Sequence, residues 1–129
     1  MDQPPTCQVS WDPRNGIARN IWAPGAGCRL EDAKAVVHAT VGLGRGAVPV
    51  LVDMRHVVKI ERSARRYFNG PDAHATAIAL LVGSAVSAII GRVMTGLLTS
   101  TPCRTFTDET AALAWLTTYA SISPPITSP

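Results

Sequence analysis

The side chains best suited to chemistry in this chain are an aspartate and two histidines near the ends of apolar runs. Asp53 closes one such run, His56 follows three residues later, and His74 opens the next run. A carboxylate beside an imidazole could exchange protons or hold a metal ion. However, the histidines lack the short spacing of metal ligands, and an aspartate at a strand end commonly ties down loop amides instead. We therefore expect no catalytic residue, no metal and no cofactor, and we expect that the protein is not an enzyme.

Motifs that bind phosphate or activate a serine are also missing from the sequence. The chain contains no GxxxxGK[ST] segment, which excludes a P-loop, and no GxSxG nucleophile elbow. Gly42, Gly44 and Gly46 follow a predicted helix rather than a strand, which is the wrong order for a dinucleotide-binding turn. We interpret these glycines as a turn that ends the helix.

One stretch, residues 49–68, combines a strand pattern with a concentration of positive charge. It begins with PVLVD, which is typical of a strand buried on both faces, and continues through a basic loop into a short polar helix. Such charges form either a binding surface or a solvated helix face, and the sequence leaves both interpretations open. The stretch holds five of the twelve Lys and Arg residues, namely Arg55, Lys59, Arg62, Arg65 and Arg66.

Length and composition favour one globular domain. The chain has 129 residues, of which 47% are hydrophobic and 16% charged, and this balance differs from that of disordered proteins. The net charge of +3 is only mildly basic, and aromatic residues make up only 5% of the chain. Nucleic-acid binders usually show a denser basic face with interleaved aromatic side chains. We therefore do not expect nucleic acid as a partner.

Cysteine usage and the first residues favour a cytoplasmic location. Cys7, Cys28 and Cys103 are far apart and form no CxxC pair, so we expect free thiols in a reducing compartment. The opening residues, MDQPPT, have neither the basic nor the apolar segment of a signal peptide.

The most apolar segment, residues 77–98, is long enough to cross a bilayer but also fits a soluble fold. It contains one charge, Arg92, which would cost about 3 kcal/mol at the centre of a membrane. Ser84 after Gly83 is a good N-cap, so the segment divides into a buried strand, a turn and a buried helix. We predict this arrangement and no membrane span.

Hydrophobic periodicity predicts a single α/β domain, residues 7–120, between flexible tails at residues 1–6 and 121–129. An N-terminal hairpin comes first, and strands then alternate with about four helices, so the sheet is expected to be mixed and mostly parallel. Thr107 is expected to cap the last helix. The predicted strands cover residues 7–11, 16–23, 48–54, 74–82 and 103–106, and the other helices cover residues 30–42, 61–68 and 84–98.

The segment LVDMRHVVKIERSARRYF resembles, without gaps, the central motif of the STAS or SpoIIAA-like domains, the anti-sigma-factor-antagonist superfamily. In that family a strand ends in an aspartate, and an Asp-Ser-Ser-Gly-like motif opens the following helix. The resemblance places Asp53 at the strand-end aspartate, Glu61 at the acidic residue and Ser63 at the phosphorylatable serine. It implies a SpoIIAA-like fold with a regulatory role.

The sequence departs from this motif on both sides of Ser63. The preceding serine is replaced by Arg62 and the following glycine by Ala64, so a kinase that recognises the family motif would meet a basic helix. Arg62, Arg65 and Arg66 could stabilise a phosphate or form a solvated face. Ser63 is therefore either a phosphorylation site or a polar residue near a helix start.

A wider pattern is similar to small actinobacterial proteins of unknown function that are related to this fold. The pattern covers about residues 16–119 and comprises LVDMR, RSARRYFNG, ALLVGSAVSAIIG and RTFTDETAALAWL. This resemblance implies the fold and names no activity.

Together these features predict a non-enzymatic regulatory or protein-interaction module. Its basic surface, residues 55–68, would face a protein partner or a second copy of the chain in a homodimer. The alternative is a protein that binds a small apolar or anionic ligand in a pocket walled by residues 84–98. The expected phosphosite or partner-surface residues are Ser63, Asp53, Arg55, His56, Glu61, Arg62, Arg65 and Arg66.

Overall fold

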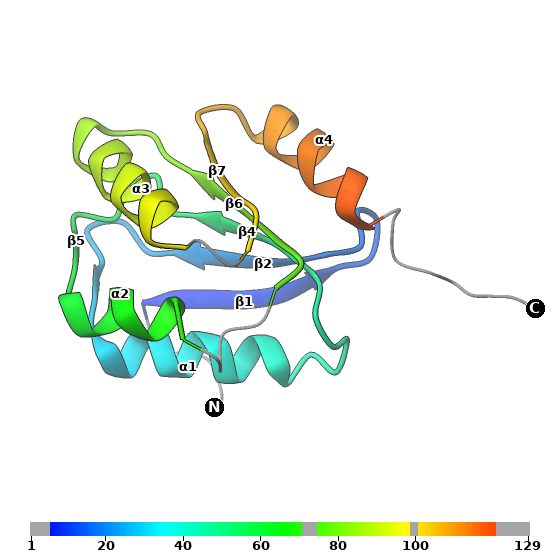
Figure 1. The fold of residues 1–129 in the computed structure, drawn as a ribbon, viewed down its shortest axis with the longest axis horizontal. Helices are drawn as coiled ribbons and strands as arrows, with labels where there is room; N and C mark the ends of the chain where they lie inside the picture. The colour runs from blue at the N-terminus through cyan, green and yellow to red at the C-terminus, as the bar shows by residue number, and fades with distance from the viewer. Residues whose placement is uncertain (1–5, 71–74, 99–100, 121–129) are drawn as a thin grey trace, which may run out of the picture.

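A computed structural model of the chain describes residues 6–70, 75–98 and 101–120. In these residues a five-stranded sheet has the order β1-β2-β4-β6-β7, as Figure 1 shows. β1 pairs antiparallel with β2 as the predicted hairpin, and the other pairings in this sheet are parallel. The strands are β1 (Cys7–Asp12), β2 (Ile17–Trp22), β4 (Pro49–Asp53), β6 (Ala77–Leu81) and β7 (Cys103–Phe106).

The mixed, mostly parallel α/β fold class is therefore confirmed. β4 lies at the centre of the sheet, as its continuous apolar run predicted, and both Val50 and Leu51 are buried. β7 lies at one edge. His74, which was predicted to open a strand, lies outside the described residues, as do residues 1–5 and 121–129 of the predicted tails.

The helices divide unequally between the two faces of the sheet. α4 packs alone on one face, where it contacts β2, β4, β6 and β7. On the other face α1 contacts β1 and α2, and α3 contacts β5 and β7. The helices are α1 (Leu30–Val41), α2 (Arg62–Phe68), α3 (Ala85–Leu97) and α4 (Glu109–Ala120).

Successive side chains of a strand point to opposite faces of the sheet, so each face has its own core. In β6, Ala77, Ala79 and Leu81 pack in the cluster that includes α4. Ile78 and Leu80 belong to the cluster that includes α1, α2 and α3. One strand therefore takes part in both cores.

The start of α4 corrects the predicted helix cap. Thr107 was the expected cap, but the backbone N–H of Ala111 donates to the Asp108 carboxylate at 2.9 Å. Asp108 therefore caps the helix, which begins at Glu109. A carboxylate at this position also stabilises the positive end of the helix dipole, which favours Asp108 over a threonine hydroxyl.

Two very short strands were missed in the sequence. β3 (Gly27–Cys28) and β5 (Lys59–Ile60) pair in parallel as a separate two-stranded sheet. Lys59 was assigned to a loop, because two residues are too few to show any periodicity. Glu61 then occupies the N-cap position of α2, so the helix begins one residue later than predicted.

α3 is not the fully buried helix that was expected. Its inner side packs closely at Gly91, where a Cβ atom would lie 2.8 Å from Cγ1 of Val82. Its outer side is exposed because no described element covers it, and its apolar residues there are 40–60% exposed, namely Val86, Ile89, Val93 and Leu97. Among the described residues, no helix combines the length and apolar character needed to cross a membrane.

Candidate functional site

An apolar cavity of about 470 Å³ lies between the sheet and the helices α1, α2 and α3. Pockets for small organic ligands commonly have volumes of about 300 to 1,000 Å³. A second, smaller hollow of about 280 Å³ lies near the start of α4, between residues that include Phe106, Asp108 and Ala111. The cavity is therefore the main candidate site.

The floor of the cavity is a row of side chains that crosses three strands. Asn20 of β2 is the register partner of Val52 in β4, and Val52 is the partner of Leu80 in β6. Trp22 and Ile78 extend the floor on either side of this row. Because these residues follow the two-residue period of their strands, they all point to the same face.

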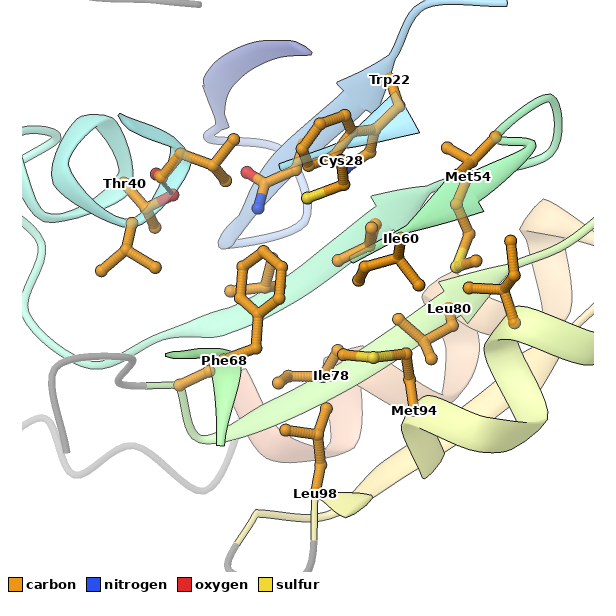
Figure 2. A pocket seen from close by; sticks show the side chains of 18 of the residues that line it. Trp22, Cys28, Thr40, Met54, Ile60, Phe68, Ile78, Leu80, Met94 and Leu98 are labelled. Atoms are coloured by element: carbon orange, nitrogen blue, oxygen red, sulfur yellow. Dashed lines mark hydrogen bonds between the residues drawn. The ribbon is translucent and has the colours of Figure 1, made fainter. Parts of the chain in front are cut away.

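The walls come from the three helices on this face, from Trp22 at the end of β2 and from the short strands β3 and β5. Figure 2 shows Trp22 and Cys28 on one side of the space, Met94 and Leu98 on the opposite side, and Phe68 between them. Phe68 is the last residue of α2, whose seven residues form a short wall. The short helix leaves space that a longer helix would fill.

The apolar side of α1 is shared between the core and the cavity. Ala33 and Val36 are buried in the core cluster of this face, and Val37 and Val41 line the cavity. Val41 is nevertheless 60% exposed. Gly46 and Ala47 also line the cavity and are exposed, so the cavity reaches the surface near the C-terminal end of α1.

The lining carries almost no polarity. Among the described residues that line the cavity none is charged, and the side chains with polar atoms are Asn20, Thr40, Cys28 and Trp22, whose indole N–H is a donor. The Thr40 hydroxyl donates to the Val36 carbonyl oxygen at 2.8 Å. The Oδ1 atom of Asn20 is buried and has no hydrogen-bond partner among the described atoms. The lining therefore suits an apolar, uncharged molecule.

Cys28 is the titratable side chain of this lining, and it is not activated. Burial, together with the nearby charges of Asp32 and Glu61, raises the pKa of its thiol to about 12. The thiol therefore stays neutral near pH 7 and is a poor nucleophile. Its Sγ atom lies 3.7 Å from the Arg29 carbonyl oxygen, to which it donates.

The predicted surface residues lie outside the cavity, and the structure separates them into two groups. In the first group, at the end of β4, Arg55 forms a two-pronged ion pair with Asp53, with distances of 3.0 Å and 2.7 Å. Burial alone would raise the pKa of Asp53, but the hydrogen bonds and charge of Arg55 hold it below its ordinary value. The Arg55 side chain packs on Gly83, beside the start of α3.

The second group lies on α2, which packs against α1. Arg62, Ser63 and Arg66 are exposed, and their side chains form no hydrogen bond or ion pair with other described residues. Arg65 is half-buried, and its Nε atom is buried without a partner among the described atoms. Glu61 precedes the helix without a side-chain cap hydrogen bond.

The remaining residues of the predicted catalytic or metal site are His56 and His74. His56 is exposed, and its carbonyl oxygen accepts a hydrogen bond from the Gly25 N–H at 2.9 Å. His74 lies outside the described residues. Within the described part of the chain, no group of His, Cys, Asp and Glu side chains could hold a metal ion.

The sequence contained one signal for the cavity that was missed. Asn20 alternates with Ala18 and Trp22 along β2, and all three are buried. An asparagine is disfavoured in strands and is unusual in an apolar, period-two row. Its position could have indicated a polar contact inside the fold.

Comparison with known proteins supplies the family. The sequence profile of the family described as "Domain of unknown function (DUF7793)" matches residues 11–120. This chain belongs to that family. The DUF7793 match includes all the strands and helices that enclose the cavity. No protein of curated function matches the chain.

The fold of this DUF7793 chain is similar to that of a protein from Shewanella loihica PV-4. The crystal structure of that protein is described as an uncharacterized protein from the DUF3478 family with a SpoIIAA-like fold. The two share 15% sequence identity with a TM-score of 0.60, over 85% of this chain and 91% of the other. The predicted SpoIIAA-like fold is therefore confirmed, whereas the likeness to actinobacterial proteins stays a prediction.

Proposed function

We propose that this chain is a non-enzymatic binding protein that holds a small, uncharged apolar molecule between the sheet and helices α1, α2 and α3. The observation that carries the proposal is a space of about 470 Å³ whose described lining contains no charged residue. The sequence left open a protein that binds a small apolar or anionic ligand, and this proposal takes the apolar case.

The hydrophobic effect supports this proposal. The cavity reaches the surface near Gly46 and Ala47, and its described walls are mostly apolar. An apolar molecule that enters it removes these walls and its own surface from water, which is favourable by about 25 cal/mol per Å² of apolar area buried.

Water is a poor substitute for such a molecule. A buried water typically makes about three hydrogen bonds with polar groups of the protein. The Thr40 and Cys28 protons are already donated to backbone carbonyls, which leaves the Asn20 amide and the Trp22 indole N–H as the side-chain donors of the described lining. An apolar ligand suits these walls better than a cluster of waters.

The lining also favours an apolar ligand over the anionic one. Burial of a carboxylate or phosphate requires a cation or several hydrogen-bond donors in contact with it. The described lining holds no Lys, Arg or His. Arg62 and Arg66 of α2 are exposed, Arg65 is half-buried, and none of the three lines the cavity.

A matched pair of variants tests the proposal. Val52 lines the cavity and Val58 does not, while Val58 is 55% exposed in the segment before β5. Titration with the uncharged fluorophore Nile red should give saturable binding to the wild type and to Val58→Phe. Val52→Phe occupies the cavity and should weaken binding by roughly tenfold or more, that is, by at least about 1.4 kcal/mol.

Circular dichroism should show that both variants are folded. If Val52→Phe is folded and binds Nile red as tightly as Val58→Phe, the dye occupies another site and the proposal is wrong. Failure of Nile red to bind the wild type would also count against it.

A regulatory or protein-interaction surface on α2 is the second candidate function. It is supported by Arg62, Ser63 and Arg66, which are exposed and whose side chains have no ion pair or hydrogen bond with other described residues. An acidic partner would supply the missing charges, and phosphorylation of Ser63 would supply one within the chain.

Charge reversal tests this second candidate. Arg62→Glu with Arg66→Glu should release an acidic partner captured from native lysate, because both side chains would repel it. The matched control reverses Arg14 and Arg92, which are exposed elsewhere. If the α2 double variant folds and keeps every partner, the surface assignment is wrong. Phosphopeptide mapping of the native protein examines Ser63 directly.

A further inference from the structure

The outer side of α3 carries a row of exposed apolar side chains that no described element covers. The members of this α3 row recur every three or four residues and are 40–60% exposed, namely Val86, Ile89, Val93 and Leu97. At this spacing they lie along one side of the helix for about three turns. Four of the seven large apolar side chains that are exposed in the described residues belong to this row. Single exposed apolar side chains are common on proteins, whereas a continuous row marks a contact surface.

The charges on α2 and α3 are all positive. α3 contains one charged residue, Arg92, and α2 contains Arg62, Arg65 and Arg66. Neither helix contains an aspartate or a glutamate. Arg62, Arg66 and Arg92 are exposed, and their side chains form no ion pair with other described residues. These helices therefore combine exposed apolar groups with uncompensated positive charge.

The two helices present these groups on the same side of the molecule. Phe68 of α2 and Met94 of α3 line the same cavity, whose floor is the sheet, as Figure 2 shows. Because both helices pack on one face of the sheet, their outer sides point away from that face. An extended surface can therefore contact the α3 row and the arginines of α2 together.

A lipid bilayer fits this surface better than a second copy of the chain does. A standard protein interface uses about 20 to 30 residues on each side, and the α3 row is only a small part of such an area. Two copies joined through the row would also bring two like-charged surfaces together, which opposes association. A bilayer needs no matching groove, because its headgroup region accommodates apolar side chains and its anionic lipids attract arginine.

We propose that the outer surface of α2 and α3 binds an anionic phospholipid bilayer. The α3 row enters the boundary between the headgroups and the acyl chains, and Arg62, Arg66 and Arg92 contact lipid phosphates. This inference goes beyond the proposed function, because it requires no ligand in the cavity. It shares Arg62 and Arg66 with the second candidate function but assigns them a lipid partner in place of a protein.

The test is flotation of the full chain with phospholipid vesicles. Vesicles that contain phosphatidylglycerol are anionic, whereas vesicles of phosphatidylcholine alone carry no net charge. We expect the wild type to bind the anionic vesicles at least about tenfold more tightly. Added salt should weaken this binding, because it screens exposed charges.

Two double variants separate the apolar and the charged contributions. Ile89→Asn with Val93→Asn removes two apolar side chains from the α3 row, and Arg62→Glu with Arg66→Glu reverses the charge on α2. Each double variant should weaken binding to anionic vesicles by about tenfold or more.

Matched controls change the same kinds of residue elsewhere. Ile21 alternates with the cavity-lining Asn20 and Trp22 along β2, so it points to the α4 face, where it is 40% exposed. Ile21→Asn should bind anionic vesicles as the wild type does. Arg14 and Arg104 are exposed, and reversing both gives the same net charge as the α2 variant but should weaken binding less.

Circular dichroism should show that the variants are folded, and Val86→Asn with Leu97→Asn replaces the first α3 pair if that pair unfolds. The proposal is overturned if the wild type does not prefer anionic vesicles, or if a folded α3 variant binds them as tightly as Ile21→Asn does.

Analytical ultracentrifugation examines a second copy of the chain as the occupant. If the wild type is a dimer and the α3 double variant is a monomer, the α3 row is a dimer interface and the proposal is wrong. Nile red binding is measured without vesicles, so this inference and the proposed function can fail independently.

Discussion

The two faces of the sheet use the same strands but pack in different ways. Under α4 the strand β6 presents Ala77 and Ala79, and these small side chains meet Ala112 and Leu116, all fully buried. Under α1, α2 and α3 the larger side chains of β6 line a cavity of about 470 Å³. One face is filled by a single helix, whereas three helices on the other face leave a space.

The comparison shows that strand composition alone does not decide how well a face is filled. Small residues on the α4 face allow the helix to approach the sheet closely, and protein interiors usually reach this close-packed density. On the cavity face α2 is short, and Gly91 holds α3 close to Val82. The α4 face is therefore the more tightly packed one, and the cavity face holds the space that we propose for ligand binding.

Replacing two neighbouring leucines by alanine should give the largest difference in stability between the two faces. Leu81 points to the α4 face and Leu80 to the cavity face, and both are buried. Leu81→Ala should lower the free energy of unfolding by about 3 to 5 kcal/mol, because it creates a new void in a filled core. Leu80→Ala should cost about 1 to 2 kcal/mol less, because its side chain already borders a space. Urea denaturation of both variants measures the difference, and equal losses would contradict the comparison.

A pair of glycines in α3 should show where the cavity face is tightly packed. Gly91→Ala should destabilise the protein by about 1 to 3 kcal/mol, because the new methyl group would clash with Val82 and Thr105. Gly96→Ala meets nothing within 4 Å and should stabilise the helix by about 0.5 to 1 kcal/mol. Thermal unfolding measures both effects. If Gly91→Ala is as stable as Gly96→Ala, α3 is not held against the sheet at this point.

Asp53, at the carboxyl end of β4, should contribute to the acid dependence of stability, whereas the cavity should not. The ion pair with Arg55 holds the pKa of Asp53 below its ordinary value of 3.8. The native state therefore binds this proton less tightly than the unfolded state. The stabilisation is present above pH 3.8 and is lost as the pH falls through the native pKa.

Arg55→Ala should reduce this stabilisation by no more than about 1 kcal/mol, because the pair is partly exposed to solvent. The exposed Arg92 of α3 serves as the control, since Arg92→Ala should leave the acid dependence unchanged. Nile red affinity should stay constant between about pH 5 and 8, because the described lining has no group that titrates there. A strong pH dependence of binding in that range would show that a charged group contacts the dye.

Much of the fold could be predicted because its strands are long apolar runs. β4 and β6 show continuous hydrophobic patterns, and the Asn-Gly signal located the turn of the hairpin. Local patterns could not reveal β3 and β5, whose pairing depends on segments about thirty residues apart. The exposed side of α3 was also missed, because the apolar sequence of a helix does not indicate whether another element packs against its outer side.

The candidate site was far less predictable than the fold. The basic residues of α2 were conspicuous in the sequence, but the cavity arises from the spacing of helices over the sheet, which no local pattern specifies. Its lining residues resemble ordinary core residues in the sequence. Asn20 alone departed from that pattern, and its burial depends on how β2 is placed between β1 and β4.

The most direct test of the account is a titration of isotope-labelled protein with decanol, followed by amide chemical shifts. The account predicts saturable changes at cavity residues such as Asn20, Phe68 and Met94, with little change at Ala112 and Leu116 under α4. Changes confined to the exposed outer side of α3, or no saturable change at the cavity residues, would contradict the claim that the three-helix face is a ligand-binding site.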